Sequence, residues 1–217
     1  MSHRIASFLV LALLLPAGTA SAEDKAHAST VLVMLGDSIT EGFGLPEEDA
    51  LPVKLEEALR AQGFDIEIRN AGISGDTTSG GAERIDWSVG EDADAVLIAL
   101  GGNDALRAIP PRETESNLEA IIAQLENRRI RVLLAGMLAP PNYGPEYGAE
   151  FNGIFPHLAE KHGLPLYPFL LDGIAADPDL NQADGIHPNE AGVAAIVAEL
   201  APFIAEALFG ADGGPAD

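Results

Sequence analysis

The sequence contains no cysteine in its 217 residues. This absence excludes a disulfide framework, a thiol nucleophile and any metal site with cysteine ligands. The stability of the folded chain must therefore come from burial of apolar side chains. The length suits one domain with a sizeable core rather than two.

Basic residues are scarce. The chain has 12 Lys and Arg residues against 34 Asp and Glu residues, which gives a formal net charge of -22 at pH 7. So acidic a surface repels polyanions, and we expect neither a nucleic acid nor an anionic membrane surface as a partner. A small neutral or zwitterionic substrate fits this charge better.

Long apolar runs are also rare, and the run near the N-terminus is too short to span a membrane comfortably. It extends from Ile5 to Pro16, whereas a spanning helix needs about 20 residues. Arg4 precedes it and Ala20-Ser21-Ala22 follows it, which is the pattern of a secretory signal peptide with its cleavage site. We predict a signal peptide over residues 1–22 and a mature domain over residues 23–209 that is periplasmic or secreted, without stable membrane insertion. An uncleaved N-terminal anchor is the alternative.

The rest of the chain alternates between two kinds of pattern. Short apolar runs bounded by Gly, Asp, Asn or Pro are typical of buried parallel strands, and they cover Thr30–Leu35, Ile66–Ile68, Ala95–Leu100, Ile130–Met137 and Leu164–Phe169. Segments with helical spacing cover Pro52–Gln62, about Ser79–Val89, Glu113–Asn127, Pro145–His162 and Asn189–Leu208. This alternation predicts a three-layer α/β/α fold with a five-stranded parallel sheet. Residues 210–217, rich in Gly, Pro, Ala and Asp, are expected to form a flexible tail.

Ser38 lies just after the first predicted strand, in the sequence Gly36-Asp37-Ser38. A tight turn at this point can raise the hydroxyl to the edge of the sheet, where α/β folds bind their ligands. A serine that only caps a helix is the alternative. The interpretation of Ser38 as a nucleophile depends on catalytic partner residues elsewhere in the chain.

His187 and Asp184 supply such partners near the C-terminus. They are three residues apart, with Gly185 between them and Pro188 after them. On a turn of this length the Asp184 carboxylate can accept the Nδ1 hydrogen of His187, which leaves Nε2 free to take the serine proton. Capping of the last helix is the alternative role for Asp184.

A nucleophilic serine also needs donors for the oxyanion that forms during acyl transfer. The loop after the third predicted strand reads Gly101-Gly102-Asn103-Asp104, in which the glycines permit close approach of a ligand and the Asn103 amide can donate. Gly72 offers a backbone N–H, although a simple turn glycine is the alternative there. This chemistry requires no metal and no cofactor.

These blocks, in this order, resemble the SGNH (GDSL) hydrolase superfamily from about Thr30 to Leu208. The resemblance implies a flavodoxin-like fold, Ser38 as the nucleophile and first oxyanion donor, Gly72 and Asn103 as the other donors, and Asp184 with His187 as the rest of a catalytic triad. Three further segments resemble the periplasmic arylesterases, acyl-thioesterases and lysophospholipases of bacteria: Gly101–Pro110, Pro141–Gly144 and Phe151–Leu158. The chain lacks a G-x-S-x-G motif, which argues against the α/β-hydrolase class.

The resulting hypothesis is an exported serine esterase that hydrolyses small carboxylic esters or thioesters, with short to medium acyl chains preferred. Apolar residues after the third and fourth predicted strands are expected to line the acyl pocket, although core packing is an alternative: Leu106, Ile109, Pro110, Leu138, Pro140 and Tyr143. A carbohydrate O-acetylesterase is a second hypothesis, disfavoured by the single tryptophan. A third hypothesis is a catalytically silent ligand-binding protein with the same fold.

Overall fold

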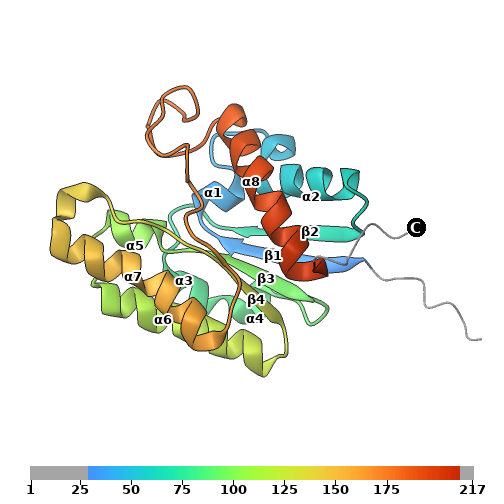
Figure 1. Ribbon diagram of the computed structural model, residues 1–217, viewed down its shortest axis with the longest axis horizontal. Coiled ribbons are helices and arrows are strands. Elements are labelled where there is room, and N and C mark those ends of the chain that lie inside the picture. Colours follow the sequence, from blue (N-terminus) through green and yellow to red (C-terminus); the bar gives the residue numbers. More distant parts are fainter. Residues whose placement is uncertain (1–28, 211–217) are drawn as a thin grey trace, which may run out of the picture.

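The computed structural model describes residues 29–210. These residues form a parallel sheet between two layers of helices (Figure 1). The predicted signal peptide, and all but the first residue of the predicted tail, lie outside the described residues. The α/β/α class predicted from the sequence is confirmed.

The sheet in the described residues has five parallel strands in the order β2-β1-β3-β4-β5. Apart from Thr30 at the start of β1, the residues of the central strands β1 and β3 are buried and almost all apolar, as expected for a parallel sheet covered by helices. The strand bounds are β1 Thr30–Gly36, β2 Ile66–Gly72, β3 Ala95–Ala99, β4 Arg131–Ala135 and β5 Leu166–Tyr167. The prediction of five strands is therefore confirmed, with β2 longer and β4 and β5 shorter than the apolar runs suggested.

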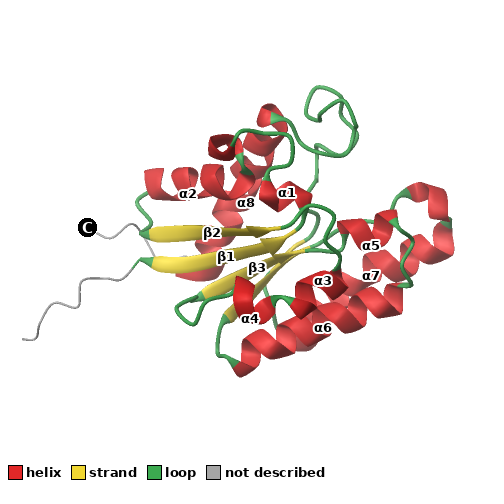
Figure 2. Ribbon diagram, turned by 180° about the vertical axis from the view of Figure 1, so that it is seen from behind, coloured by secondary structure: helices red, strands yellow, loops and turns green. Residues whose placement is uncertain are grey.

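Helices cover both faces of the sheet (Figure 2). One face carries α2 Leu51–Ala61 and α8 Glu190–Phe209, and the other carries α3 Thr78–Glu83, α4 Ile85–Ser88, α6 Pro111–Asn127 and α7 Pro145–His162. Two short helices that the sequence patterns did not indicate, α1 Ser38–Glu41 and α5 Gly102–Leu106, follow β1 and β3 directly. Single 3-10 turns occupy Glu47–Asp49 and Pro141–Tyr143.

Arg84 interrupts the single helix predicted over residues 79–89. Its backbone leaves helical geometry at φ −110° and ψ 5°, which separates α3 from α4. The side chain turns inward, where its guanidinium donates to the carbonyls of Gly36 and Ala71 and forms an ion pair with Asp76 at 2.6 Å. The helix breaks because Arg84 satisfies the carbonyls at the ends of β1 and β2.

Helix α8 is long and apolar enough, by length and composition, to cross a membrane. Its valine, isoleucine and leucine side chains are nevertheless buried within the described domain, among them Val193, Ile196, Leu200 and Ile204. A helix that is apolar around most of its surface is typical of a position inside a core. Here α8 packs beside α2 against the sheet.

The order of the strands creates one crevice at the carboxyl ends of β1 and β3. The chain leaves β1 toward β2 on one side and later returns to β3 on the other, so the sheet order reverses at this point. In open α/β sheets such a reversal forms the site where ligands bind. Ser38 and Asn103 both lie in the first turns after these two strands.

Candidate active site

The turn after β1 places Ser38 at the first position of α1. Asp37 caps this helix, because its Oδ1 accepts the N–H of Ile39 at 3.1 Å. Glycine is required at position 36, since a Cβ there would lie 1.9 Å from the Thr40 Oγ1 and 3.2 Å from the Ala99 carbonyl oxygen. The Ser38 N–H belongs to the first turn of a helix, whose amides have no partner within the helix.

The segment before α8 places Asp184 and His187 on one tight turn. Asp184 Oδ1 accepts the backbone N–H groups of Ile186 and His187 at 2.9 and 3.0 Å, and Asp184 Oδ2 lies 2.7 Å from His187 Nδ1. The hydrogen bond to the His187 side chain, followed by the two backbone bonds, lowers the pKa of Asp184 to about 2. The carboxylate is therefore ionised and available to fix the tautomer of His187.

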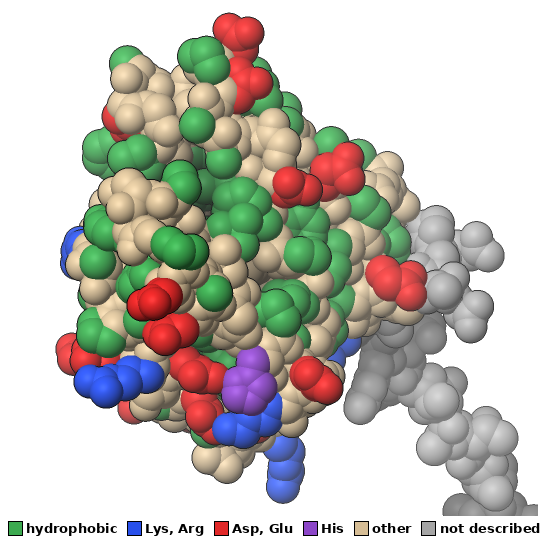
Figure 3. All heavy atoms as spheres, turned by 60° about the vertical axis from the view of Figure 1, so that its left-hand side comes forward, with side chains coloured by type: hydrophobic (Ala, Val, Ile, Leu, Met, Phe, Trp, Pro, Cys, Tyr) green, Lys and Arg blue, Asp and Glu red, His purple; other side chains and the backbone are tan. Residues whose placement is uncertain are grey.

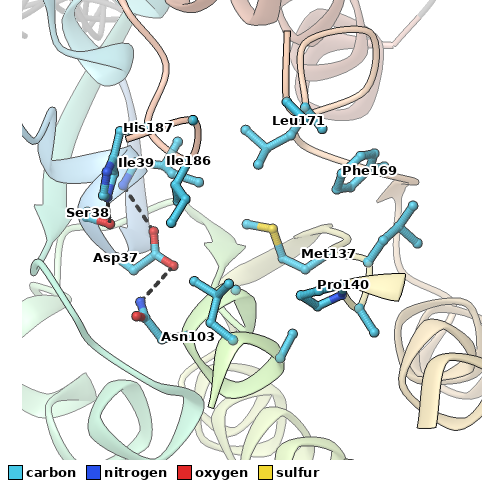
Figure 4. Close-up of a pocket in the computed structure, with 18 of the residues that line it drawn as sticks. Asp37, Ser38, Ile39, Asn103, Met137, Pro140, Phe169, Leu171, Ile186 and His187 are labelled. Atoms are coloured by element: carbon cyan, nitrogen blue, oxygen red, sulfur yellow. Dashed lines mark hydrogen bonds between the residues drawn. The ribbon is translucent and has the colours of Figure 1, made fainter. Parts of the chain in front are cut away.

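Ser38 and His187 meet although they are 149 positions apart. The Ser38 Oγ lies 2.9 Å from His187 Nε2, and Figure 4 shows the two side chains facing each other at one end of the cavity. The hydrogen-bonded chain Ser38–His187–Asp184 can remove the serine proton while the carboxylate holds the imidazole in place. The structure brings together all three residues that the sequence predicted for this chemistry.

Asn103 also reaches this site, and it contacts Asp37. Its Nδ2 donates to Asp37 Oδ2 at 3.4 Å (Figure 4). Burial, which leaves Asp37 2% exposed, raises the pKa of this carboxyl group to about 6 against the opposing effect of its hydrogen bonds. One hydrogen of the Asn103 amide is thus used for orientation, and the second remains available to a ligand.

Asp104 supports the turn that carries Asn103. It is fully buried and accepts the backbone N–H of Thr78 at 2.9 Å, the Thr78 hydroxyl, and the Thr114 hydroxyl at 3.3 Å. These hydrogen bonds connect α5, which contains Asp104, to α3 through Thr78 and to α6 through Thr114. The sequence places Asp104 beside Asn103 but gives no signal for its partners, which lie in distant segments.

The Gly72 N–H, predicted to be an oxyanion donor, already has an acceptor in the structure. It donates to Asn70 Oδ1 at 2.9 Å, so this amide is already used. The position requires glycine for a steric reason, because a Cβ would lie 2.2 Å from the backbone nitrogen of Glu41. The expectation for Gly72 is corrected accordingly: it allows α1 to pack against the end of β2.

Gly75 follows three residues later, at the tip of the same loop. It has a φ of +79° and its carbonyl accepts a bond from Arg107 Nη2 at 2.8 Å. The loop passes close to the nucleophile turn, because the Ile73 N–H donates to the Gly36 carbonyl at 3.2 Å. The Gly75 N–H has no acceptor within residues 29–210.

A cavity of about 380 Å³ opens beside Ser38 and His187. Its walls are mostly apolar and come from the loops after β3, β4 and β5 and from the turn before α8. The principal apolar residues are Met137, Leu138, Pro140, Phe169, Leu171 and Ile186. Figure 3 shows that apolar side chains also gather on the outer face at the end of the molecule where α5 and α7 lie, with acidic side chains among them.

Only some of the residues predicted to line the acyl pocket do line the cavity. Leu106, Leu138 and Pro140 line the cavity, whereas Ile109, Pro110 and Tyr143 do not. Tyr143 instead donates its hydroxyl hydrogen to the Leu106 carbonyl at 2.6 Å, and so supports the wall from outside. The loop after β5 supplies a wall that the sequence patterns did not indicate.

The histidines of α7 are engaged in separate surface contacts. His157 Nδ1 lies 2.6 Å from Glu115, and His162 Nδ1 lies 3.3 Å from Glu126. Within the described part of the chain, no group of three or more His, Asp or Glu side chains is arranged to hold a metal ion.

Comparison with known proteins agrees with the class of protein that this fold and site define, a hydrolase on a parallel α/β sheet. Residues 34–195 match the model of the GDSL-like Lipase/Acylhydrolase family, and the chain belongs to this family. An arylesterase of Vibrio mimicus is 38% identical over 83% of this chain and 86% of its own length. The thioesterase 1/protease 1/lysophospholipase L1 of Escherichia coli K12 is 34% identical over 84% of this chain and 83% of its own length.

A solved structure supports the same assignment. The crystal structure of AlinE4, an SGNH-hydrolase family esterase, is 44% identical in sequence and covers 83% of this chain and 97% of its own, with a TM-score of 0.69. The chain is therefore an ester-hydrolysing enzyme with an SGNH hydrolase fold. The flavodoxin-like fold and the esterase class expected from the sequence are confirmed.

Proposed function

We propose that this protein is an exported serine esterase that hydrolyses small carboxylic esters or thioesters through an acyl-enzyme on Ser38. The observation that carries the proposal is the continuous hydrogen-bonded chain from Ser38 Oγ to His187 Nε2, at 2.9 Å, and from His187 Nδ1 to Asp184 Oδ2, at 2.7 Å. A serine hydroxyl is a weak nucleophile at neutral pH, and a base in this position activates it.

The reaction proceeds in two halves. His187 takes the hydroxyl proton while Ser38 Oγ attacks the carbonyl carbon, and it then returns that proton to the departing alcohol or thiol. A water molecule attacks the acyl-enzyme with His187 again as the base, and the carboxylic acid leaves as Ser38 recovers its proton. Asp184 stays ionised throughout and stabilises the imidazolium.

The oxyanion of each tetrahedral intermediate needs donors beside Ser38. The Ser38 N–H and the second hydrogen of the Asn103 amide are two of them. For the third we assign the Gly75 N–H in place of Gly72, because the Gly72 amide is bonded to Asn70 and the Gly75 amide has no acceptor among the described residues.

The substrate places its acyl chain in the apolar cavity beside Ser38. One of the two relatives is named an arylesterase and the other a thioesterase, protease and lysophospholipase, so aryl esters, thioesters and lysophospholipids are the ester classes to compare. The cavity of about 380 Å³ suits short to medium acyl chains rather than long ones. Leu106 and Pro140 are expected to contact the chain directly.

A kinetic comparison on the purified protein tests this function. Hydrolysis of p-nitrophenyl esters from C2 to C16, an acyl-CoA thioester and a lysophospholipid is measured for the wild type and for Ser38→Ala. We expect short to medium esters to give the highest kcat/KM and Ser38→Ala to lose at least about 10⁴-fold in kcat. Turnover retained by Ser38→Ala would refute the assignment, and a maximum at C16 or on an acetylated sugar would refute the proposed substrate class.

Export is proposed from the sequence alone, through the signal pattern over residues 1–22. Expression of the full chain in a bacterial host, followed by fractionation and N-terminal sequencing, should recover a periplasmic or secreted form that begins near Glu23. Recovery of an unprocessed chain in the membrane fraction would favour the uncleaved anchor.

A further inference from the structure

Phe43 lies against the imidazole of His187. The two ring centroids are 4.6 Å apart and the ring planes meet at 38°. Phe43 directly follows Gly42, which ends α1 in the left-handed conformation at φ +91°. This turn places the Phe43 ring beside His187 and leaves the side chain 48% exposed.

The two hydrogen bonds of His187 act in the plane of its ring. Nδ1 faces Asp184 at 2.7 Å and Nε2 faces Ser38 at 2.9 Å. Bonds in the ring plane define the direction of the imidazole but restrain its tilt out of that plane only weakly. Contact with the Phe43 ring supplies a restraint from outside the plane.

Gln182 fixes Phe43 relative to the turn that carries His187. Its side-chain Nε2 donates to the Phe43 carbonyl at 2.7 Å and to the Pro188 carbonyl at 3.0 Å, and its backbone N–H donates to the His187 carbonyl at 2.8 Å. Glycine is needed at position 44, because a Cβ there would lie 2.2 Å from Gln182 Oε1 and its φ is +77°. One side chain thus clamps two segments that are far apart in sequence.

We infer that Phe43, held by Gln182, is a positioning residue for the reaction: it keeps His187 directed at Ser38 and stabilises the imidazolium that forms when the serine proton is transferred. This inference rests on the proposed function. An aromatic face within about 6 Å of a cation attracts it, so the contact strengthens as His187 becomes charged. Neither Phe43 nor Gln182 lines the cavity, so the expected effect is on kcat rather than on substrate binding.

Steady-state kinetics of four variants test the inference. Phe43→Ala is expected to lower kcat about tenfold with KM changed less than about twofold, as the loss of one favourable aromatic contact predicts. Phe43→Tyr keeps the ring and should keep kcat. Gln182→Glu keeps the shape but replaces the amide donor with an acceptor facing two carbonyls, and it should reproduce the Phe43→Ala loss. Trp87→Ala removes an exposed aromatic side chain outside the site and is the matched control.

The combined variant Phe43→Ala/Gln182→Glu should lose no more than either single variant, because both act through the same contact. A second readout is the downfield ¹H resonance of the proton between His187 Nδ1 and Asp184, which should be sharp in the wild type and broadened by exchange in Phe43→Ala. Rescue by Tyr and a change in this resonance are outcomes that a merely structural role would not produce. Phe43→Leu, which keeps apolar volume, serves if Phe43→Ala does not fold.

A folded Phe43→Ala or Phe43→Leu variant with wild-type kcat would overturn the inference. So would a rise in KM at constant kcat, which would make Phe43 a substrate contact. These failures are distinct from failure of the proposed function: if Ser38→Ala loses activity while the Phe43 and Gln182 variants remain fully active, only the positioning role is wrong. If Ser38→Ala remains active, the proposed function itself fails.

Discussion

The two halves of the site are built in different ways. Ser38 and Asn103 lie in the first turns after β1 and β3, strands whose side chains are almost completely buried. Asp184 and His187 lie in the irregular segment between β5 and α8, where Asp184 is exposed. The sheet positions the nucleophile through core packing, whereas local polar contacts position the base.

The segment between β5 and α8 is anchored in the core by Leu170 and Ile174, and the part of it next to the Asp184–His187 turn is held by side chains that bond to the segment's own backbone. Asn181 Nδ2 donates to the carbonyls of Ile174 and Asp177 at 2.6 and 2.8 Å, and Asn189 Nδ2 donates to the carbonyl of Asp179 at 2.9 Å. Exposed stretches with few buried apolar contacts, such as residues 182–187, open locally at lower free energy than a core strand does. We therefore expect substitutions in the exposed Asp184–His187 turn to affect mainly activity. Substitutions of buried residues at the carboxyl ends of the strands should affect mainly stability.

The largest expected effect is on the activity of Asp184→Asn. The asparagine Oδ1 can keep the bonds to the backbone N–H groups of Ile186 and His187, but its Nδ2 would face His187 Nδ1 and favour the wrong tautomer. We expect kcat to fall about 10⁴-fold, equivalent to about 5.5 kcal/mol. The bond to His187 that lowers the pKa of Asp184 also stabilises the folded state, but solvent screens it on this exposed side chain, so the midpoint of thermal unfolding should fall less than it does when a buried ion pair is broken. A variant that unfolds at markedly lower temperature would contradict the separation of the two halves.

Arg84→Met should show the reverse pattern, with a large loss of stability. Arg84 is 4% exposed and joins the ends of β1 and β2 to Asp76. Its removal leaves a largely buried carboxylate unpaired, which costs about 3 to 5 kcal/mol in the free energy of unfolding. Urea denaturation measures this loss.

Arg69→Met is the matched control for Arg84→Met. Arg69 pairs with Asp92 at 2.8 Å on the surface, and exposed ion pairs contribute about 0 to 1 kcal/mol. Equal losses in the two variants would show that the ends of β1 and β2 do not depend on the buried arginine. At temperatures where Arg84→Met stays folded, its kcat should remain far above that of Asp184→Asn.

The smallest of the three effects depends on pH and concerns Asp37. Burial raises the pKa of Asp37 from 3.8 to about 6 in the folded protein. Between these values the folded state binds more protons than the unfolded state, so the contribution of Asp37 to the free energy of unfolding falls as the pH rises. The full loss, reached above about pH 6, is at most about 3 kcal/mol.

Comparison with Asp37→Asn isolates this contribution from the other acidic residues. The asparagine Oδ1 can still cap α1 at the Ile39 N–H, but it does not titrate. Between pH 4 and pH 7 the wild type should lose stability relative to Asp37→Asn, as measured by urea denaturation at each pH. Parallel curves would mean that Asp37 is already ionised at pH 4 in the folded state.

The sequence predicts the sheet-built half well because its signals are local. Buried parallel strands appear as short apolar runs, and the tight turns after them contain the Gly-Asp-Ser and Gly-Gly-Asn-Asp blocks. The Asp184–His187 turn was also predictable, since the two side chains lie on the same short turn. Their meeting with Ser38 followed from the expected order of the blocks and the crevice of the sheet.

What the sequence could not predict depends on partners in distant segments. The bond from the Gly72 N–H to Asn70 Oδ1, the inward turn of Arg84 and the clamp formed by Gln182 all require three-dimensional contacts. The cavity wall from the loop after β5 has no periodicity and no motif. For the same reason the sequence could not separate Leu106 and Pro140, which line the cavity, from Ile109 and Tyr143, which do not.

Mass spectrometry after treatment with a fluorophosphonate tests the central claim most directly, because this reagent reacts with a serine that an adjacent base has activated. We predict a single adduct on the peptide that contains Ser38, no adduct in Ser38→Ala, and much slower labelling in His187→Ala. An adduct on another residue, or ester hydrolysis that persists without any adduct on Ser38, would contradict the account.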